Sequence, residues 1–205
     1  MSADTPRIAA VVLAAGEATR MGEPKVTLPY EGTTIVESVV SVAAEAGLDP
    51  IVVVTGFYHE AVSAVIGDRA VVVHNPDAAS GNLSSLRVGV GAIGDADAVV
   101  LLLGDMPGVD PQVVQLLAHR TVAAGALGGW VQYRRDHNDG EELGHPLVLS
   151  RRGLDGFSAL TGRRPVWRYL TSLDPDDVVI LDVDSEKPID VNTPDDYRRL
   201  LAEQS

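Results

Sequence analysis

The chain contains no cysteine, which excludes a disulfide, a thiolate nucleophile and an iron–sulfur cluster. It also lacks any apolar run near the ~20 residues that a helix needs to cross a bilayer. Residues 1–7 show no basic stretch followed by a long apolar one, so we expect no signal peptide. These absences predict a cytoplasmic protein that depends on its hydrophobic core alone for stability.

Basic and aromatic residues are scarce. Only 16 Lys and Arg stand against 29 Asp and Glu, which gives a formal net charge of −13 and a pI of about 4.6. An acidic surface of this kind repels nucleic acid and anionic membranes. Aromatic residues make up 4 % of the chain, too few for the stacking platforms of single-strand binding proteins. A polyanionic ligand would therefore need a local cationic pocket.

Apolar sequence, by contrast, is sufficient for one core. With 205 residues of which 45 % are hydrophobic, we expect a single domain over residues 1–205. Apolar, β-branched runs predict strands at Ile8–Leu13, Ile51–Thr55, Ala70–His74, Ala98–Leu103, Gly129–Tyr133, Pro146–Leu149 and Val178–Val183. Several of these runs are apolar throughout, as expected of central parallel strands that are buried on both faces.

Helical patterns fill the gaps between these runs. Thr34-Ile35-Val36-Glu37 predicts a capping box at the start of a helix that ends near Gly47. Further helices are predicted at His59–Ile66, Ser84–Ile93, Asp110–Ala124, Pro165–Ser172 and Pro194–Glu203. The alternation of strands and helices predicts an open, mostly parallel α/β sheet.

The alternation fails between Gly129 and Leu149. Two strand-like runs are joined there by the polar segment Arg134–Gly144, which leaves no room for a crossover helix. A hairpin is the connection that fits, so at least one strand should run antiparallel to the rest of the sheet.

The segment Leu13–Lys25, which reads LAAGEATRMGEPK, directly follows the first predicted strand. Gly16 and Gly22 can adopt positive φ and let backbone N–H groups approach an anion. Arg20 and Lys25 add two cations to the same space. This combination predicts a site for a polyphosphate.

Neither familiar phosphate loop explains the segment. The Walker pattern requires four residues between its glycines, whereas five separate Gly16 from Gly22, and the dinucleotide fingerprint G-x-G-x-x-G is absent. The absence of the dinucleotide fingerprint speaks against an NAD or FAD enzyme. The alternative interpretation is a plain strand–loop connection in which the glycines turn the chain and the cations are solvated.

Other polar residues follow strands whose carboxyl ends share one edge of the sheet, where open α/β sheets bind their ligands. Asn75 follows the third predicted strand, and Gly81-Asn82-Leu83-Ser84-Ser85 then begins a helix whose free N–H groups favour an anion. Gly104 and Asp105 follow the fourth. The Asp105 carboxylate can hold Mg²⁺, which prefers one or two carboxylates with waters and phosphate oxygens. The alternative is an aspartate that caps the next turn, a contribution of about 1 kcal/mol.

Two further polar positions come later in the chain. Thr193 precedes Pro194 and so caps a predicted helix, but Asp190 lies ahead of that cap and needs another explanation. His145 stands at the exit of the predicted hairpin. It is either a hydrogen-bonding surface group or a neutral imidazole that contacts a substrate.

The succession LAAGxxxRMGxPK, NPD…G..SSLR, GDMP, GHP and DVNTPDDY, which runs in order from Leu13 to Tyr197, resembles the MobA-like nucleotidyltransferases. Within that family the chain is most similar to the molybdenum cofactor cytidylyltransferases. The resemblance implies a three-layer, GT-A-like, Rossmann-like α/β fold with a mixed sheet. It also implies a reaction in which CTP and molybdopterin-bound molybdenum give a cytosine dinucleotide cofactor and pyrophosphate.

The resemblance implies a catalytic set of Arg20, Lys25 and Asp105, with the two cations on the phosphates and Asp105 on Mg²⁺. Asp190 would be a second metal contact. The nucleotide would lie along Leu13, Ala14, Ala15, Gly16, Arg20, Lys25, Asn75, Gly81, Ser84, Ser85 and Gly104.

The same resemblance places the acceptor on Arg87, His145 and Asn192. Nucleotide binding would then occupy about residues 1–107, and acceptor binding about residues 108–205. The implied partners are a nucleoside triphosphate, a molybdopterin-type cofactor and a recipient molybdenum hydroxylase.

The base of the nucleotide substrate is predicted from one position in the sequence. Guanylyltransferase relatives usually read LAGG where this chain reads LAAG, so the methyl group of Ala15 favours CTP over GTP, by only ~1–3 kcal/mol. The alternatives are guanylyl or other nucleotidyl transfer to a sugar phosphate or a small phospho-acid. A molybdenum cofactor carrier without turnover is a further alternative.

Overall fold

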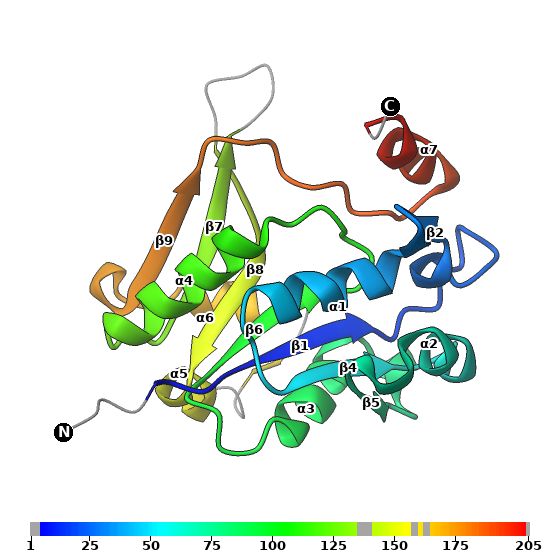
Figure 1. The fold of residues 1–205 in the computed structure, drawn as a ribbon. Helices are drawn as coiled ribbons and strands as arrows, with labels where there is room; N and C mark the ends of the chain where they lie inside the picture. The colour runs from blue at the N-terminus through cyan, green and yellow to red at the C-terminus, as the bar shows by residue number, and fades with distance from the viewer. Residues whose placement is uncertain (1–4, 135–140, 157–159, 162–164, 204–205) are drawn as a thin grey trace.

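The computed structural model describes residues 5–134, 141–156, 160–161 and 165–203. Seven strands form one sheet in the order β5-β4-β1-β6-β8-β7-β9 (Figure 1). The strands are β1 (Ile8–Ala14), β4 (Ile51–Thr55), β5 (Val71–His74), β6 (Ala98–Leu103), β7 (Gly128–Arg134), β8 (Glu141–Ser150) and β9 (Val178–Val183). Strand β8 is antiparallel to both of its neighbours, and the other strand pairs are parallel. The predicted mixed sheet is confirmed.

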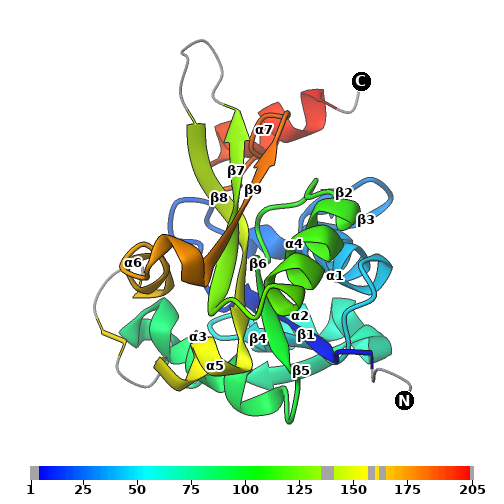
Figure 2. The ribbon, with the colours of Figure 1, turned by 90° about the vertical axis from the view of Figure 1, so that its left-hand side faces the viewer.

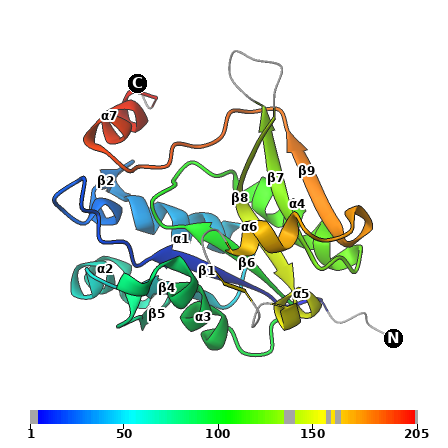
Figure 3. The ribbon, with the colours of Figure 1, turned by 180° about the vertical axis from the view of Figure 1, so that it is seen from behind.

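Helices cover both faces of the sheet. On one face lie α1 (Ile35–Glu45), α2 (His59–Ile66) and α4 (Pro111–Ala123), and on the other α3 (Asn82–Ala92), α5 (Arg151–Asp155) and α6 (Pro165–Leu170) (Figures 1 and 3). Strand β1 explains why two cores form: Ala10 and Val12 pack on the first face, and Ala9 and Val11 on the second. None of the described helices is long and apolar enough to span a bilayer.

The C-terminal helix α7 (Pro194–Ala202) packs apart from these layers. Leu200 joins Tyr30, Ile35 and Val191 in a small third core beside the short hairpin of β2 (Pro29–Tyr30) and β3 (Thr33–Thr34). Figure 2 shows β7 and β8 rising beyond the other strands on the side where α7 lies.

The segment between β9 and α7, residues 184–193, is called the strap here. It returns across the carboxyl edge of the parallel strands, where the Val191 N–H donates to the Asp105 carbonyl at 2.9 Å. This bond brings the C-terminal part of the chain to the end of β6.

Long and strongly patterned elements match the sequence predictions best. The predicted limits of β6, β9 and α2 agree with the structure, and the hairpin between β7 and β8 is confirmed. The connecting residues 135–140 lie outside the described residues. Thr34 caps its helix in a complete capping box, as predicted. Thr193 is the predicted helix cap, and the structure shows a complete capping box there too.

Several short elements escaped prediction. The strands β2 and β3 have two residues each, and α5 has five. The four 3₁₀ turns in the described parts of the chain are η1 (Lys25–Thr27), η2 (Gly67–Arg69), η3 (Ala78–Ser80) and η5 (Pro175–Asp177). Segments this short contain less than two turns or one pleat, so they show no hydrophobic period. Elsewhere the predicted and observed limits of an element differ by a few residues. The predicted strand Pro146–Leu149, for example, is the C-terminal part of β8, which begins at Glu141.

Candidate functional site

A cavity of about 470 Å³ opens at the carboxyl edge of β1 and β6, and we call it the first cavity. Five segments that are distant in sequence form its wall: the loop after β1, the loop after β4, the turn before α3, the end of β6 and the strap. Its polar and charged wall residues are Glu17, Thr19, Arg20, Lys25, Tyr58, Asn82, Ser85, Asp105, Asp190 and Asn192. The edge predicted from the sequence is therefore where a site lies.

The end of β1 and the loop after it contribute the residues from Leu13 to Arg20 to this wall. Two of its residues have positive φ, Gly22 at +74° and Ala18 at +53°. The sequence prediction is right for Gly22 and wrong for Gly16, whose φ is not positive; Ala18 makes the turn instead, accepting from the N–H groups of Met21 and Gly22. The Tyr58 hydroxyl donates to the Glu17 carbonyl at 2.9 Å and ties this loop to the start of α2.

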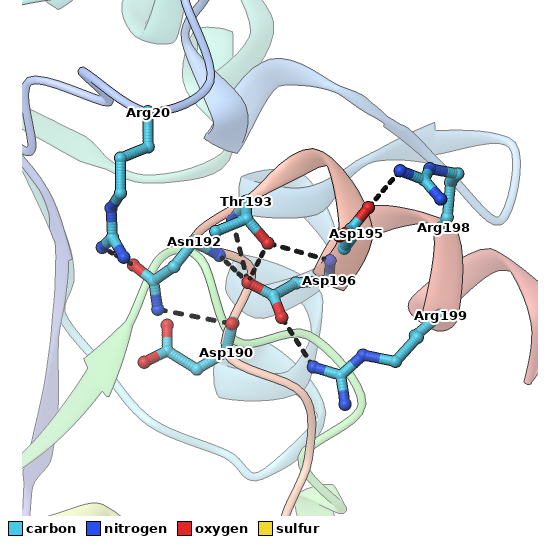
Figure 4. Close-up of polar contacts among 8 residues, drawn as sticks. All are labelled: Arg20, Asp190, Asn192, Thr193, Asp195, Asp196, Arg198 and Arg199. Carbon is cyan, nitrogen blue, oxygen red and sulfur yellow. Dashed lines mark hydrogen bonds and ion pairs between the residues drawn. The ribbon is translucent and has the colours of Figure 1, made fainter.

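The charged centre of the first cavity lies where β1, β6 and the strap meet. The Lys25 ammonium is paired with the Asp105 carboxylate and donates to Asn192 Oδ1 at 2.9 Å. Arg20 reaches the same Asn192 oxygen at 3.4 Å, and Asn192 Nδ2 donates to the Asp190 carbonyl at 3.3 Å (Figure 4). Both predicted cations therefore converge on one point, and their carboxylate and amide partners come from distant parts of the chain.

The electrostatics of Asp105 favour a further cation at this centre. Burial raises the pKa of the Asp105 carboxyl above its ordinary value, the Lys25 ammonium opposes that shift, and the Asp190 carboxylate adds to it. Asp105 and Asp190 also line the same wall. A second cation between them would stabilise both ionised carboxylates.

A divalent metal fits this donor set. Mg²⁺ and Mn²⁺ are hard cations that take carboxylate oxygens, and a nucleotide-bound Mg²⁺ needs only one or two of them. The described residues contain no group of three or more His, Cys, Asp or Glu that would hold a metal by themselves. The pair Asp105 and Asp190 therefore suits a metal that arrives with phosphate oxygens, and not a closed structural site.

The strap is fixed by the helix that follows it. The Asp196 carboxylate accepts from the N–H groups of Asn192 and Thr193 and is paired with Arg199 (Figure 4). Burial opposes ionisation, but these hydrogen bonds lower the pKa of Asp196 to about 2. The cap thus holds the backbone on which Asn192 faces Lys25.

Several predicted site residues do not line the first cavity. Asn75 is 2 % exposed, and its amide donates to the hydroxyls of Ser84 and Ser85 at 2.9 Å. Of these three, only Ser85 reaches the cavity wall. Asn75 instead ties the end of β5 to the first turn of α3.

Gly81, Gly104 and Arg87 also lie outside both this wall and that of the second cavity described below. Gly81 is the residue before α3, the Gly104 N–H donates to the Leu13 carbonyl at 2.9 Å, and Arg87 donates to the Leu160 carbonyl at 3.1 Å. These contacts give the three residues structural partners within the protein.

A second cavity of about 470 Å³ adjoins the first. Leu13, Asn82, Leu103 and Asp190 line both, so the two spaces share a wall. The second cavity alone is lined by Leu86, Leu101, Met106, Gly144, His145, Leu147, Pro165, Val166, Trp167, Thr171 and Lys187. It is more apolar than the first.

His145 is the predicted acceptor residue that the structure places in the second cavity, whereas Asn192 lines the first. His145 Nδ1 lies 3.2 Å from the Leu101 carbonyl oxygen, and the imidazole ring meets the Trp167 ring edge-on, with 6.3 Å between the ring centroids. Burial lowers the pKa of His145 to about 4, so the imidazole is neutral near pH 7. Of the two interpretations, the structure favours a neutral imidazole that faces a binding space.

Sequence reasoning missed Asn82, Tyr58, Trp167 and Lys187. Asn82 stands two residues before Ser84 in the segment that begins α3, and it lies on the wall common to both cavities. Tyr58 follows a strand and could have been found at the same sheet edge. Trp167 and Lys187 belong to no motif, and only the path of the strap and of α6 shows where they lie.

The chain is similar to known proteins over most of its length. The family model described as the MobA-like NTP transferase domain matches residues 10–178. The molybdenum cofactor cytidylyltransferase of Escherichia coli K12 is 27 % identical over 198 residues, which cover 91 % of this chain and 92 % of the relative. The nicotine blue oxidoreductase of Paenarthrobacter nicotinovorans is 32 % identical over 150 residues, covering 71 % and 72 %.

Among solved structures, Rv0371c from Mycobacterium tuberculosis H37Rv has a TM-score of 0.81 and 35 % identity, and the match covers 96 % of this chain and 98 % of that one. A second crystal structure of that protein is a complex with manganese, with a TM-score of 0.76 and 36 % identity over the same shares of the two chains.

Proposed function

Because the chain belongs to the MobA-like NTP transferase family and is a nucleotidyltransferase, we propose that it transfers a cytidylyl group from CTP to a molybdopterin-type molybdenum cofactor. The observation that carries the proposal is the pair of cavities with a common wall at Asp190, one charged and one largely apolar. Similarity to a cytidylyltransferase over 91 % of the chain supports this substrate choice.

The first cavity would hold the triphosphate. Ala14, Ala15 and Gly16 line the space that we propose for the nucleoside, while Arg20 and Lys25 offer positive charge where the phosphates would lie. Lys25 is held by Asp105 and Asn192, and it is free to exchange those partners for phosphate oxygens when a nucleotide enters.

The reaction requires no protein nucleophile. A phosphate oxygen of the acceptor attacks the α-phosphorus of CTP, the bond from that phosphorus to the bridging oxygen breaks, and pyrophosphate leaves. Catalysis then consists of positioning and of charge neutralisation. Lys25 and Arg20 stabilise the charge that develops on pyrophosphate, and the acceptor phosphate is already ionised near pH 7, so no strong general base is needed.

Asp105 and Asp190 are the residues that would hold a divalent metal, which we propose to be Mg²⁺. When bound, such a metal would neutralise charge on the α-phosphate. The similar protein Rv0371c, crystallised with manganese, supports divalent metal use.

The test is pyrophosphate release from CTP, GTP and ATP with Mg²⁺, with and without molybdenum-loaded molybdopterin. We expect release from CTP only when the cofactor is present, together with a product of the mass of the cytosine dinucleotide. Release from GTP would assign the chain to guanylyl transfer. Nucleotide binding without release in any combination would overturn the proposal in favour of another phosphorylated acceptor or of a carrier.

A further inference from the structure

The shape of the loop after β1 is not set by burial. No side chain of residues 15–25 is buried, although the structure describes this whole segment, and the next buried one is Val26. One turn within the loop holds itself, since the Ala18 carbonyl accepts from the N–H groups of Met21 and Gly22. Ala18 stands there at a φ of +53°, a left-handed conformation that is unfavourable for a residue with a Cβ. The conformation of the loop therefore depends on contacts from other elements.

The turn between β4 and α2 supplies two such contacts. The Tyr58 hydroxyl donates to the Glu17 carbonyl at 2.9 Å. Two residues earlier, Gly56 lies so close to the loop that a Cβ built on it would be 2.6 Å from the Ala15 carbonyl oxygen. The same Cβ would be 2.5 Å from the Cβ of Ala78, which belongs to the turn before α3. The loop thus rests on Gly56 and is hydrogen-bonded to Tyr58.

Tyr58 is itself held by the core. It immediately precedes α2, and its side chain packs against the hydrophobic core on that face of the sheet. The Tyr58 carbonyl also accepts from the Val62 N–H at 3.0 Å. Val62 and Ile66, on the same helix, are fully buried. A tether that starts from a close-packed helix can restrain a loop that has no buried anchor of its own.

The direction of the Glu17 carbonyl decides the direction of the next N–H group. This carbonyl and the Ala18 N–H belong to one planar trans peptide, so they point to opposite sides. Because the carbonyl is turned toward Tyr58, the Ala18 N–H is turned away from it, and no described residue accepts a bond from that N–H. Ala18 and Arg20 both line the first cavity. A backbone N–H next to a guanidinium suits a phosphate oxygen.

We infer that Tyr58 is a positioning residue for the triphosphate: by holding the Glu17 carbonyl, it presents the Ala18 N–H to the phosphates of the nucleotide. Tyr58 acts through the backbone of the loop and does not need to touch the reacting atoms. It belongs to none of the motifs from which the site was predicted. The inference rests on the proposed function only in that the first cavity receives a nucleoside triphosphate, and it holds for any base and any acceptor.

Binding of CTP and of tripolyphosphate, each measured by calorimetry with Mg²⁺, tests the role of Tyr58. Tripolyphosphate has the phosphates but no base, so it reports on the phosphate contacts alone. Tyr58→Phe removes only the hydroxyl, and we expect it to weaken the binding of both probes by about three- to tenfold, the scale of one hydrogen bond. Tyr197→Phe is the matched control, because the Tyr197 hydroxyl also donates to a backbone carbonyl, that of Pro29 at 2.7 Å, but Tyr197 lines neither cavity. Its affinities should stay within about twofold of the wild type.

Transfer kinetics distinguish positioning from a loss of folded enzyme. We expect Tyr58→Phe to raise the KM for CTP by about the same factor and to leave kcat within about threefold, because a saturating nucleotide holds the loop in its bound shape. A partly unfolded protein would instead have a lower kcat at an unchanged KM, and thermal melting would show the loss of fold.

The outcomes separate this inference from the proposed function. An unchanged affinity of Tyr58→Phe for both probes, a loss for CTP alone, or a lower kcat at an unchanged KM would overturn the inference and leave the function intact. Weaker binding of both probes by Tyr58→Phe, in a protein that transfers no cytidylyl group to molybdopterin, would retain the inference and reject that function. A wild-type protein that binds neither probe would overturn both, since the first cavity would then not be a triphosphate site.

Discussion

Lys25, which follows the loop after β1, forms an ion pair with Asp105, which follows β6. Their side chains are 12 % and 19 % exposed, so the pair is largely removed from water. Asn192 on the strap holds the same ammonium. Burial and the nearby Asp190 carboxylate both raise the pKa of Asp105, so a metal cation bound beside them would stabilise the two ionised carboxylates.

Asp105→Asn tests this centre most directly. The amide has nearly the shape of the carboxylate but lacks its charge, so the fold should persist while the rate falls by at least ~100-fold, because several kcal/mol of metal-dependent stabilisation are lost. Circular dichroism and pyrophosphate release measure the two effects. Asp184→Asn, at an exposed position on the strap, is the control. A variant with the wild-type rate in Mg²⁺ would remove Asp105 from the metal site.

Removing divalent metal should abolish transfer and leave the protein folded. The described residues contain no group of three or more His, Cys, Asp or Glu that could hold a structural metal, and the cores are apolar. We expect EDTA to stop pyrophosphate release without changing the melting temperature, and Mg²⁺ or Mn²⁺ in excess to restore the rate. A large drop in melting temperature with EDTA would indicate a structural metal instead.

Lys25→Ala should reduce kcat/KM through loss of charge stabilisation on the leaving pyrophosphate. The expected loss is ~2–4 kcal/mol, on the scale of one preorganised oxyanion donor, which corresponds to roughly 30- to 1,000-fold. Steady-state kinetics with CTP and saturating acceptor measure it. Arg69→Ala, which removes a cation that is paired with Glu37 and lines neither cavity, provides the comparison. A loss under threefold would contradict a phosphate role for Lys25.

The sequence predicted the part of the site that lies in contiguous motifs. Arg20, Lys25 and Asp105 stand directly after strands, and the rule that ligands bind at the carboxyl edge is enough to bring them together. It did not foresee the internal partners of Asn75 and Arg87, because a polar side chain looks alike in sequence whether it faces a ligand or a group of the protein. The structure supplies those partners, Ser84 and Ser85 for Asn75 and Leu160 for Arg87.

The second cavity could not be derived in the same way. Its walls come from β8, α6 and the strap, and these meet only because β8 reverses direction and the strap crosses the sheet edge. The GHP motif located His145 but not its tautomer, which depends on the Leu101 carbonyl of a neighbouring strand. Long-range pairing of this kind leaves no local signal around Lys187 or Trp167.

Base selection can be tested at Ala15. Ala15 is among the residues that line the first cavity, and its methyl group is the difference between the LAAG and LAGG forms of the loop. We expect Ala15→Gly to shift the ratio of kcat/KM for CTP and GTP toward GTP by roughly 10- to 150-fold, the scale of one methyl group in a pocket. Competition between the two nucleotides in one reaction gives this ratio. An unchanged ratio would place base selection elsewhere in the cavity.

The cap at Asp196 links the stability of the strap to pH. Because hydrogen bonds from Arg199, Thr193 and the Asn192 N–H outweigh burial and lower the pKa of Asp196 to about 2, the folded state favours the carboxylate. Because the pKa of Asp196 is lowered in the folded state, the ionised carboxylate stabilises the fold at pH values above 3.8, the ordinary pKa of the group. This stabilisation is lost as the pH falls toward 2. The side chain is 16 % exposed, so the full contribution near neutral pH is about 2 kcal/mol.

Asp196→Asn should therefore reduce the free energy of unfolding by ~1–2 kcal/mol at pH 7 and by roughly half as much at pH 3. Urea denaturation of both proteins at the two pH values measures the difference. Asp195→Asn is the matched control, since Asp195 is the neighbouring aspartate of the same helix turn, is 74 % exposed and contacts only Arg198 in Figure 4. The strap carries Asn192, which holds Lys25, so Asp196→Asn should also weaken CTP binding at pH 7. An equal loss of stability at both pH values would show that the cap acts through packing and not through the ionised carboxylate.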